Sequence, residues 1–252
     1  MLPSTGMPDA LAGWYQVQLA TLPVFLFFDD RRHCRAIHNS SWTIESLNTE
    51  SNVSGREEAL TSGQALKQAG LKFDLVFTSL LKRAHQTLDI VLQEIEQTDL
   101  SVVKSWKLNE RHYGGLTGLN KADAAAKYGD KQVQIWRRSY NVPPPVMEED
   151  HPMNNVIVNN PKFSMIRKED FPKVESLEMT QRRVVAFWTE EIVPHIKAGK
   201  KVLVVAHGTS LRSLVKYLEG MIIIVVVTLV GNRVLVVVTM IGNRVLIYTQ
   251  NI

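Results

Sequence analysis

The most constraining feature of the sequence is the apolar run Lys201-Val-Leu-Val-Val-Ala206, which leads directly into His207-Gly-Thr-Ser210. A continuous run of β-branched and aliphatic residues predicts a strand buried on both faces, as in parallel sheets. A helix is expected to follow from Leu211 to Leu218. A buried strand that passes into a helix through a short polar turn favours an α/β fold.

Strand-like and helix-like segments alternate along the first half of the chain. Short apolar runs predict strands, and longer segments with apolar residues three or four positions apart predict helices. The expected elements are a strand at 24–28, a helix at 54–70 that ends at Gly70, a strand at 73–78, a helix at 80–97 and a strand near 102–103. This order predicts a mainly parallel sheet covered by helices.

The second half is expected to add further helices and one long loop. Helices are predicted at 122–126, where Asn120 can act as the N-cap, at 132–140 and at 177–196. Between them, the segment from Asn141 to Pro172 is rich in proline and asparagine. A structureless loop of this length inside a domain usually has a function, such as covering a site.

The chain is predicted to have three parts: a loose N-terminal arm at 1–23, an α/β domain at 24–220 and an atypical hydrophobic repeat at 221–252. Seven of ten positions are identical between Val227–Val236 and Val238–Ile247. Gly-Asn between β-branched runs is a hairpin signal. A three-stranded meander is therefore expected at about 222–230, 233–241 and 244–249, joined to the same domain.

Composition excludes several classes of protein. The net charge is only +4, and no basic run carries interleaved aromatic residues, so a nucleic-acid partner is not expected. The single cysteine, Cys34, fits a reducing compartment. No apolar stretch reaches the roughly 20 residues that a membrane-spanning helix needs, so no membrane partner is expected.

The stretch Leu108–Lys121 concentrates groups suited to an anionic substrate. It contains one carboxylate, two cations and three glycines, which are Glu110, Arg111, Lys121, Gly114, Gly115 and Gly118. Glycine lets backbone approach a ligand closely, and Arg137 and Arg138 add two guanidiniums further along the chain. This much positive charge around one carboxylate favours a small phosphorylated acid.

Two histidines are expected beyond the carboxyl ends of strands, where open parallel sheets bind ligands. His33 follows the first strand, and His207 stands at the start of a helix, whose free N–H groups favour a phosphate. Arg83 follows another strand. A histidine in such a place can be a phosphoryl nucleophile or can bind the transferred group. The remaining histidines considered, His85, His112, His151 and His195, are interpreted as surface or packing residues.

These motifs resemble those of the 2,3-bisphosphoglycerate-dependent phosphoglycerate mutases of the histidine phosphatase superfamily. The resemblance spans residues 55–220. It is carried by Phe73–Ala84, Leu108–Lys121, Ile135–Tyr140, Val142–Pro145, Glu175–Leu177 and Ala206–Arg212.

The resemblance implies a three-layer α/β/α sandwich and ping-pong phosphoryl transfer through a phosphohistidine, with 2,3-bisphosphoglycerate as the phosphoryl primer and no metal. The resemblance also suggests a cytoplasmic homodimer. His33 would be the nucleophile, Glu110 the acid/base and His207 the second active-site histidine. The implied ligands of substrate phosphate and carboxylate are Arg32, Asn39, Arg83, Arg111, Tyr113, Lys121, Arg137, Arg138 and Thr209.

The sequence also departs from the family pattern. Cys34 and Arg35 follow His33 where the family has glycine and glutamate, and Thr209 replaces an asparagine. The family's C-terminal strand and tail are replaced by the hydrophobic repeat. The leading hypothesis is an enzyme that interconverts 3- and 2-phosphoglycerate. A non-catalytic phospholigand-binding protein and a phosphatase stay open as alternatives.

Overall fold

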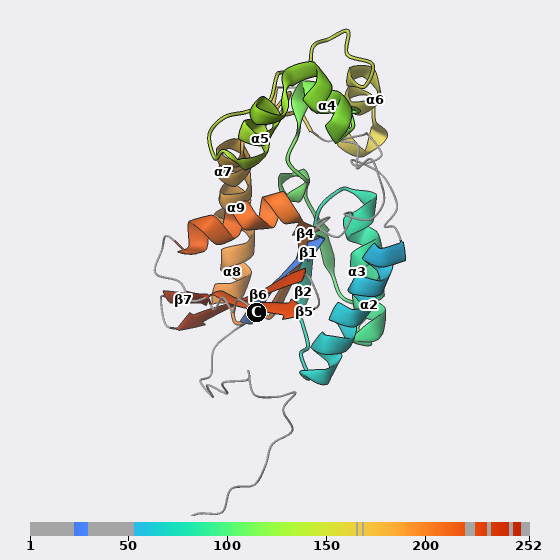
Figure 1. Ribbon diagram of the computed structural model, residues 1–252. Coiled ribbons are helices and arrows are strands. Elements are labelled where there is room, and N and C mark those ends of the chain that lie inside the picture. Colours follow the sequence, from blue (N-terminus) through green and yellow to red (C-terminus); the bar gives the residue numbers. More distant parts are fainter. Residues whose placement is uncertain are drawn as a thin grey trace, which may run out of the picture.

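The computed structural model describes residues 23–29, 53–164, 166–167, 169–219, 225–230, 233–241 and 244–247. A single sheet runs through this part of the chain, and helices cover it (Figure 1). None of the described helices is both long and apolar enough to cross a membrane.

The centre of the sheet is parallel. Its strands stand in the order β3 (Val102–Lys104), β2 (Leu75–Thr78), β4 (Val202–His207) and β1 (Pro23–Asp29). The last of these four strands in the sequence, β4, therefore lies between β1 and β2. In the β1–β4 register Asp29 stands opposite His207, and in the β2–β4 register Thr78 stands opposite Val205. The carboxyl ends of these three strands thus meet at one edge.

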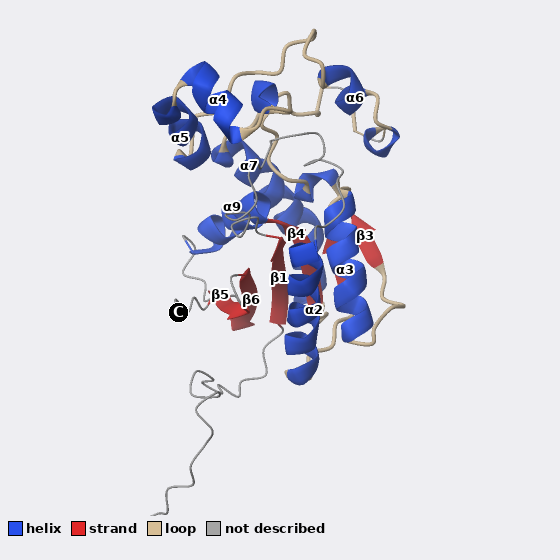
Figure 2. Cartoon of the chain, turned by 45° about the vertical axis from the view of Figure 1, so that its right-hand side comes forward, coloured by secondary structure: helices blue, strands red, loops and turns tan. Residues whose placement is uncertain are grey.

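Alternating side chains on the strands pack against helices on both faces of the sheet. Val76 and Leu203 pack with apolar residues of α2 (Val53–Gln68) and α3 (Lys82–Glu94). Phe77 and Val204 point the other way, toward α7 (Leu177–Phe187), α8 (Val193–Lys197) and α9 (Gly208–Glu219). Figures 1 and 2 show α2 and α3 on one side of the strands and α7 and α9 on the other. The predicted three-layer α/β fold with a mainly parallel centre is confirmed.

Local signals account for several helix ends. The amide of Gly70 (φ +64°) donates to the Lys67 carbonyl, and the amide of Leu71 donates to the Leu66 carbonyl, which together form a Schellman motif after α2. Asn120 caps α4 (Lys121–Tyr128), since its side chain accepts from the Asp123 amide. Both ends were expected from the sequence.

A helical cap stands at the carboxyl edge of the sheet (Figure 1). It contains α4, α5 (Asp130–Arg138) and α6 (Asn154–Val158), together with the short 3-10 turns η4 (Gly114–Leu116) and η5 (Pro161–Phe163). The expectation of a structureless loop at 141–172 is wrong, because α6 and η5 interrupt it. Another 3-10 turn, η3 (Trp106–Leu108), follows β3.

The helix predicted at 177–196 is interrupted. A π-helical turn, η6 (Trp188–Ile192), separates α7 from α8. Pro194 lies in the first turn of α8 and has no N–H group, so it cannot continue the ordinary hydrogen-bond ladder from η6.

Three C-terminal strands are present as predicted: β5 (Val225–Val230), β6 (Arg233–Ile241) and β7 (Arg244–Ile247). Neighbouring strands are antiparallel, and β6 also pairs antiparallel with β1. The hydrophobic repeat thereby extends the central sheet beyond β1.

Candidate active site

His207 lies at the carboxyl edge of the sheet, as the last residue of β4. It is buried, and the next residue begins α9. The Nε2 atom of His207 is hydrogen-bonded to the hydroxyl of Ser79, at 2.8 Å. That hydroxyl also accepts the Leu81 amide at 3.1 Å, and the Ser79 carbonyl contacts Nε2 of His85 at 2.7 Å. These contacts fix the orientation of the His207 ring.

Arg83 stands in the first turn of α3, just beyond the carboxyl end of β2. Its side chain is buried rather than solvated. A buried guanidinium beside the carboxyl ends of β2 and β4 is a permanent positive charge, because arginine does not lose its proton in proteins.

The segment that carries Glu110 is tied to both β2 and α9 through Asn109. The Asn109 side chain accepts the Leu80 amide at 2.9 Å. The hydroxyl of Ser210 donates to the Asn109 carbonyl at 2.5 Å. Ser210 is in the first turn of α9, so this bond brings the Glu110 segment to the β4–α9 junction that holds His207. Glu110 is half-buried, and one carboxylate oxygen accepts the Arg111 amide at 2.8 Å.

Arg111, which is buried, and Tyr113, which is half-buried, form a pair beneath the cap. The Arg111 guanidinium lies over the Tyr113 ring, 4.8 Å from its centroid, and Nη2 donates to the Trp136 carbonyl of α5 at 2.7 Å. Burial raises the pKa of Tyr113, and a hydrogen bond from the Thr209 side chain opposes this effect. Thr209, expected as a substrate ligand, is therefore engaged by Tyr113.

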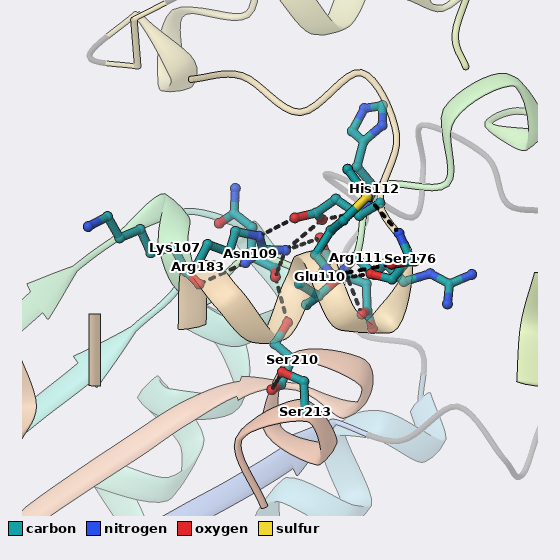
Figure 3. Close-up of polar contacts among 12 residues, drawn as sticks. Lys107, Asn109, Glu110, Arg111, His112, Ser176, Arg183, Ser210 and Ser213 are labelled. Carbon is teal, nitrogen blue, oxygen red and sulfur yellow. Dashed lines mark hydrogen bonds and ion pairs between the residues drawn. The ribbon is translucent and has the colours of Figure 1, made fainter. Parts of the chain in front are cut away.

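A buried ion pair between Arg183 and Glu175 holds the same segment. Figure 3 shows Arg183 beside Lys107 and Asn109. Nε of Arg183, in α7, donates to one carboxylate oxygen of Glu175 at 2.5 Å, and Nη2 donates to the other at 2.9 Å. Arg183 also donates to the main-chain carbonyls of Lys107 and Asn109, at 2.7 and 2.9 Å.

The family model of the histidine phosphatase superfamily (branch 1) matches residues 31–155 and 160–245. The chain belongs to this superfamily.

Solved structures agree with this assignment at the level of the fold. A phosphoglycerate mutase from Bacillus anthracis is 18% identical, with 91% of this chain and 92% of that chain covered and a TM-score of 0.59. The α-ribazole phosphatase from Shigella flexneri is 17% identical, with 92% and 96% covered and a TM-score of 0.60. A mycobacterial glucosyl-3-phosphoglycerate phosphatase complexed with VO3 is 18% identical, with 92% and 98% covered and a TM-score of 0.59.

In this superfamily member, the predicted site residues divide into three groups. The segments that carry His207, Glu110, Arg111, Tyr113 and Thr209 are joined by hydrogen bonds and a cation-π contact, and Arg83 stands at the same edge of the sheet. Arg137 and Arg138 are exposed in the last turn of α5. The remaining candidates, Arg32, His33, Asn39 and the side chain of Lys121, lie outside the described part of the structure.

Sequence reasoning missed three residues of this site: Ser79, Glu175 and Arg183. Ser79 carried a usable signal, because it follows a strand in the same way as His207. Glu175 lies in a segment that carried the resemblance, but no role was assigned to it. Arg183 carried no signal, since a charged pair whose members are eight positions apart and share no helix turn is not predicted from local patterns.

His112, interpreted as a surface or packing residue, is a packing residue. It is buried and packs edge-on against Phe171, with 5.8 Å between ring centroids. It borders a cavity of about 460 Å³ whose walls include Met147, Ile157 and Phe163. His207, Arg83 and Glu110 do not line this cavity. Its largely apolar wall is unsuited to a phosphorylated acid.

Proposed function

We propose that the chain interconverts 3-phosphoglycerate and 2-phosphoglycerate through a phosphohistidine on His33, primed by 2,3-bisphosphoglycerate. Membership of the histidine phosphatase superfamily supports phosphoryl chemistry. The resemblance of Leu108–Lys121 and Trp136–Arg138 to the mutase motifs supports the substrate. The fold likeness to a phosphoglycerate mutase is consistent with both.

The observation that carries the proposal is the meeting of β1, β4 and the Glu110 segment at one edge of the sheet. Asp29 at the end of β1 stands opposite His207, and His33 is four residues further along the chain. Four residues span at most about 14 Å, so His33 is within reach of this edge. The Ser210–Asn109 hydrogen bond brings the acid/base candidate to the same place.

The proposed chemistry needs one nucleophile and one acid/base. A ring nitrogen of His33 attacks phosphorus of 2,3-bisphosphoglycerate, the phosphorus–oxygen ester bond breaks, and the Glu110 carboxylic acid gives its proton to the leaving oxygen. In the second half, the Glu110 carboxylate takes the proton of the acceptor hydroxyl, whose oxygen attacks the phosphohistidine. His207 and Arg83 stabilise the negative charge that spreads over the transferred phosphoryl oxygens.

Substrate binding is assigned to the cationic groups beneath and on the cap. Arg111 is held rigidly by Tyr113 and the Trp136 carbonyl, so it can bind a carboxylate or phosphate with little loss of side-chain entropy. Arg137 and Arg138 stand exposed at the end of α5, where further anionic groups of the substrate can be bound.

The test is phosphorylation of the purified protein by 2,3-bisphosphoglycerate, quenched in alkali and mapped by mass spectrometry, together with turnover of 3-phosphoglycerate. The proposal expects label on His33, no label in His33→Ala, and formation of 2-phosphoglycerate. If the protein is labelled but then only releases inorganic phosphate, it is a phosphatase and not a mutase.

A folded parent that binds the ester but forms no phosphohistidine would overturn the catalytic proposal and leave a phospholigand-binding protein. Arg83→Ala should then abolish binding if phosphate recognition is retained.

A further inference from the structure

We propose that Glu175 and Arg183 form a positioning bracket that holds Glu110 where it can protonate the leaving oxygen of the substrate. The inference rests on the proposed function, since it assigns Glu110 the acid/base role. The bracket residues do not touch the reacting atoms. They act through the main chain on either side of Glu110.

The bracket is a fixed, buried pair. The side chains of Arg183 and Glu175 are only 10% and 3% exposed. Two hydrogen bonds, of 2.5 and 2.9 Å, join the guanidinium to the carboxylate in a bidentate pair. Burial alone would raise the pKa of Glu175, but the charge and hydrogen bonds of Arg183 lower it below its ordinary value. The carboxylate therefore stays ionised at neutral pH.

The remaining donors of Arg183 hold the chain that leads into Glu110. Nη1 donates to the carbonyl of Lys107 at 2.7 Å, and Nη2 donates to the carbonyls of Asn109 at 2.9 Å and Glu110 at 3.3 Å. Figure 3 shows Arg183 beside this stretch of main chain.

Glu175 holds the chain that leaves Glu110. Its carboxylate accepts the amide of His112 at 2.9 Å, and its own amide donates to the His112 carbonyl at 2.8 Å. The main chain is thus fixed two residues beyond Glu110 by Glu175, and before it by Arg183.

This support matters because residues 109–113 belong to no helix or strand. Carbonyls there have no ladder partner, and buried carbonyls need a donor. The planar guanidinium supplies several donors in a fixed fork, whereas a lysine ammonium is a compact charge on a flexible stem. Lysine at 183 would keep the charge but leave some of these carbonyls without a hydrogen-bond donor, so the main chain at Glu110 should shift.

The consequence is specific to proton transfer. A misplacement of about 1 Å can lower a rate roughly 100-fold. An ester whose leaving group needs no proton, such as p-nitrophenyl phosphate, bypasses the acid. A phosphate ester of an aliphatic alcohol, such as 2,3-bisphosphoglycerate, does not.

The experiment measures phosphohistidine formation from both esters in the parent, Arg183→Lys and Arg182→Lys. Arg182 is the matched control, because it precedes Arg183 on α7, is 75% exposed and pairs with Glu178 on its own helix. For Arg183→Lys we expect a loss of about 10- to 100-fold with 2,3-bisphosphoglycerate and less than about 3-fold with p-nitrophenyl phosphate. Arg182→Lys should change neither rate.

A second variant and a double variant test the same inference independently. Glu175→Gln keeps the shape of the bracket but not its charge, and it should move the ratio of the two rates in the same direction. It decides the question if Arg183→Lys does not fold. In a Glu110→Gln background, Arg183→Lys should cause no further loss with 2,3-bisphosphoglycerate, since the group it positions is already gone.

Equal losses with both esters would overturn the inference and leave Arg183 as a residue that only stabilises the fold. Failure of the proposed function looks different, because the parent would then form no phosphohistidine from either ester. In that case amide exchange of the 107–112 peptide still tests the bracket. Faster exchange in Arg183→Lys than in Arg182→Lys supports it, and equal exchange overturns it.

Discussion

Acidification between pH 7 and pH 5 should destabilise this protein largely through one residue, His112. Burial lowers the pKa of His112 from 6.5 to about 4, with smaller opposing effects from the Glu175 charge and the Lys173 main chain. The charges of Arg183 and His151 lower it further. The neutral ring also accepts the Gly114 amide on Nδ1, at 3.3 Å, and protonation of that atom would remove the acceptor.

The direction of the stability change follows from the linkage between protonation and folding. The folded-state pKa is below that of the unfolded chain, so the unfolded state takes up the proton first as the pH falls. The stability that neutral His112 contributes is therefore fully present above about pH 6.5 and is lost between pH 6.5 and about pH 4. A pKa difference of about 2.5, at roughly 1.4 kcal/mol per unit, amounts to about 3 kcal/mol in all. About 2 kcal/mol of this should be lost between pH 7 and pH 5.

The assay is urea unfolding of the parent, His112→Gln and His85→Gln at pH 7, 6 and 5. His112→Gln should be less stable at pH 7 but should lose most of the pH dependence. His85→Gln is the control: burial also lowers the pKa of His85, but this side chain is only half-buried, so most of the slope should remain. Glu175 does not contribute to the pH dependence between pH 7 and pH 5, because a carboxyl group with a lowered pKa changes stability only below about pH 4.5. An unchanged slope in His112→Gln would refute the reasoning.

Two further predictions concern the site. In urea unfolding, Gly114→Ala should lower the free energy of unfolding by about 2–4 kcal/mol more than Gly70→Ala does. A Cβ at Gly114 would lie 2.3 Å from the Pro145 carbonyl oxygen, whereas a Cβ at Gly70 would meet nothing within 4 Å. Both have positive φ, so equal losses would contradict the role of the clash. Ser79→Ala should slow phosphohistidine formation roughly 10-fold in the alkaline-quench assay while costing only about 1 kcal/mol of stability, since it removes the hydroxyl bound to His207. An unchanged rate would show that Ser79 does not orient the ring.

The sequence by itself determined the elements whose signals are local. The helix at 80–97 was predicted from the spacing of its apolar residues alone. In the structure α3 and its two flanking residues bury six of them: Leu81, Ala84, Leu88, Val91, Leu92 and Ile95. The cap at Asn120 and the helix end at Gly70 were also predicted. These features depend on residues a few positions apart, so the chain carries them without reference to the rest of the fold.

The tertiary structure decided how distant segments meet at the site. Ser79 and His207 are separated by 128 positions, and they meet because β4 is inserted between β1 and β2. Arg183 reaches the Lys107 carbonyl across 76 positions. No local pattern encodes such pairs, because strand order and the docking of α7 depend on the packing of the whole core. The sequence therefore predicted Glu110 and His207 as candidates, whereas the residues that hold them in place became visible only in the folded chain.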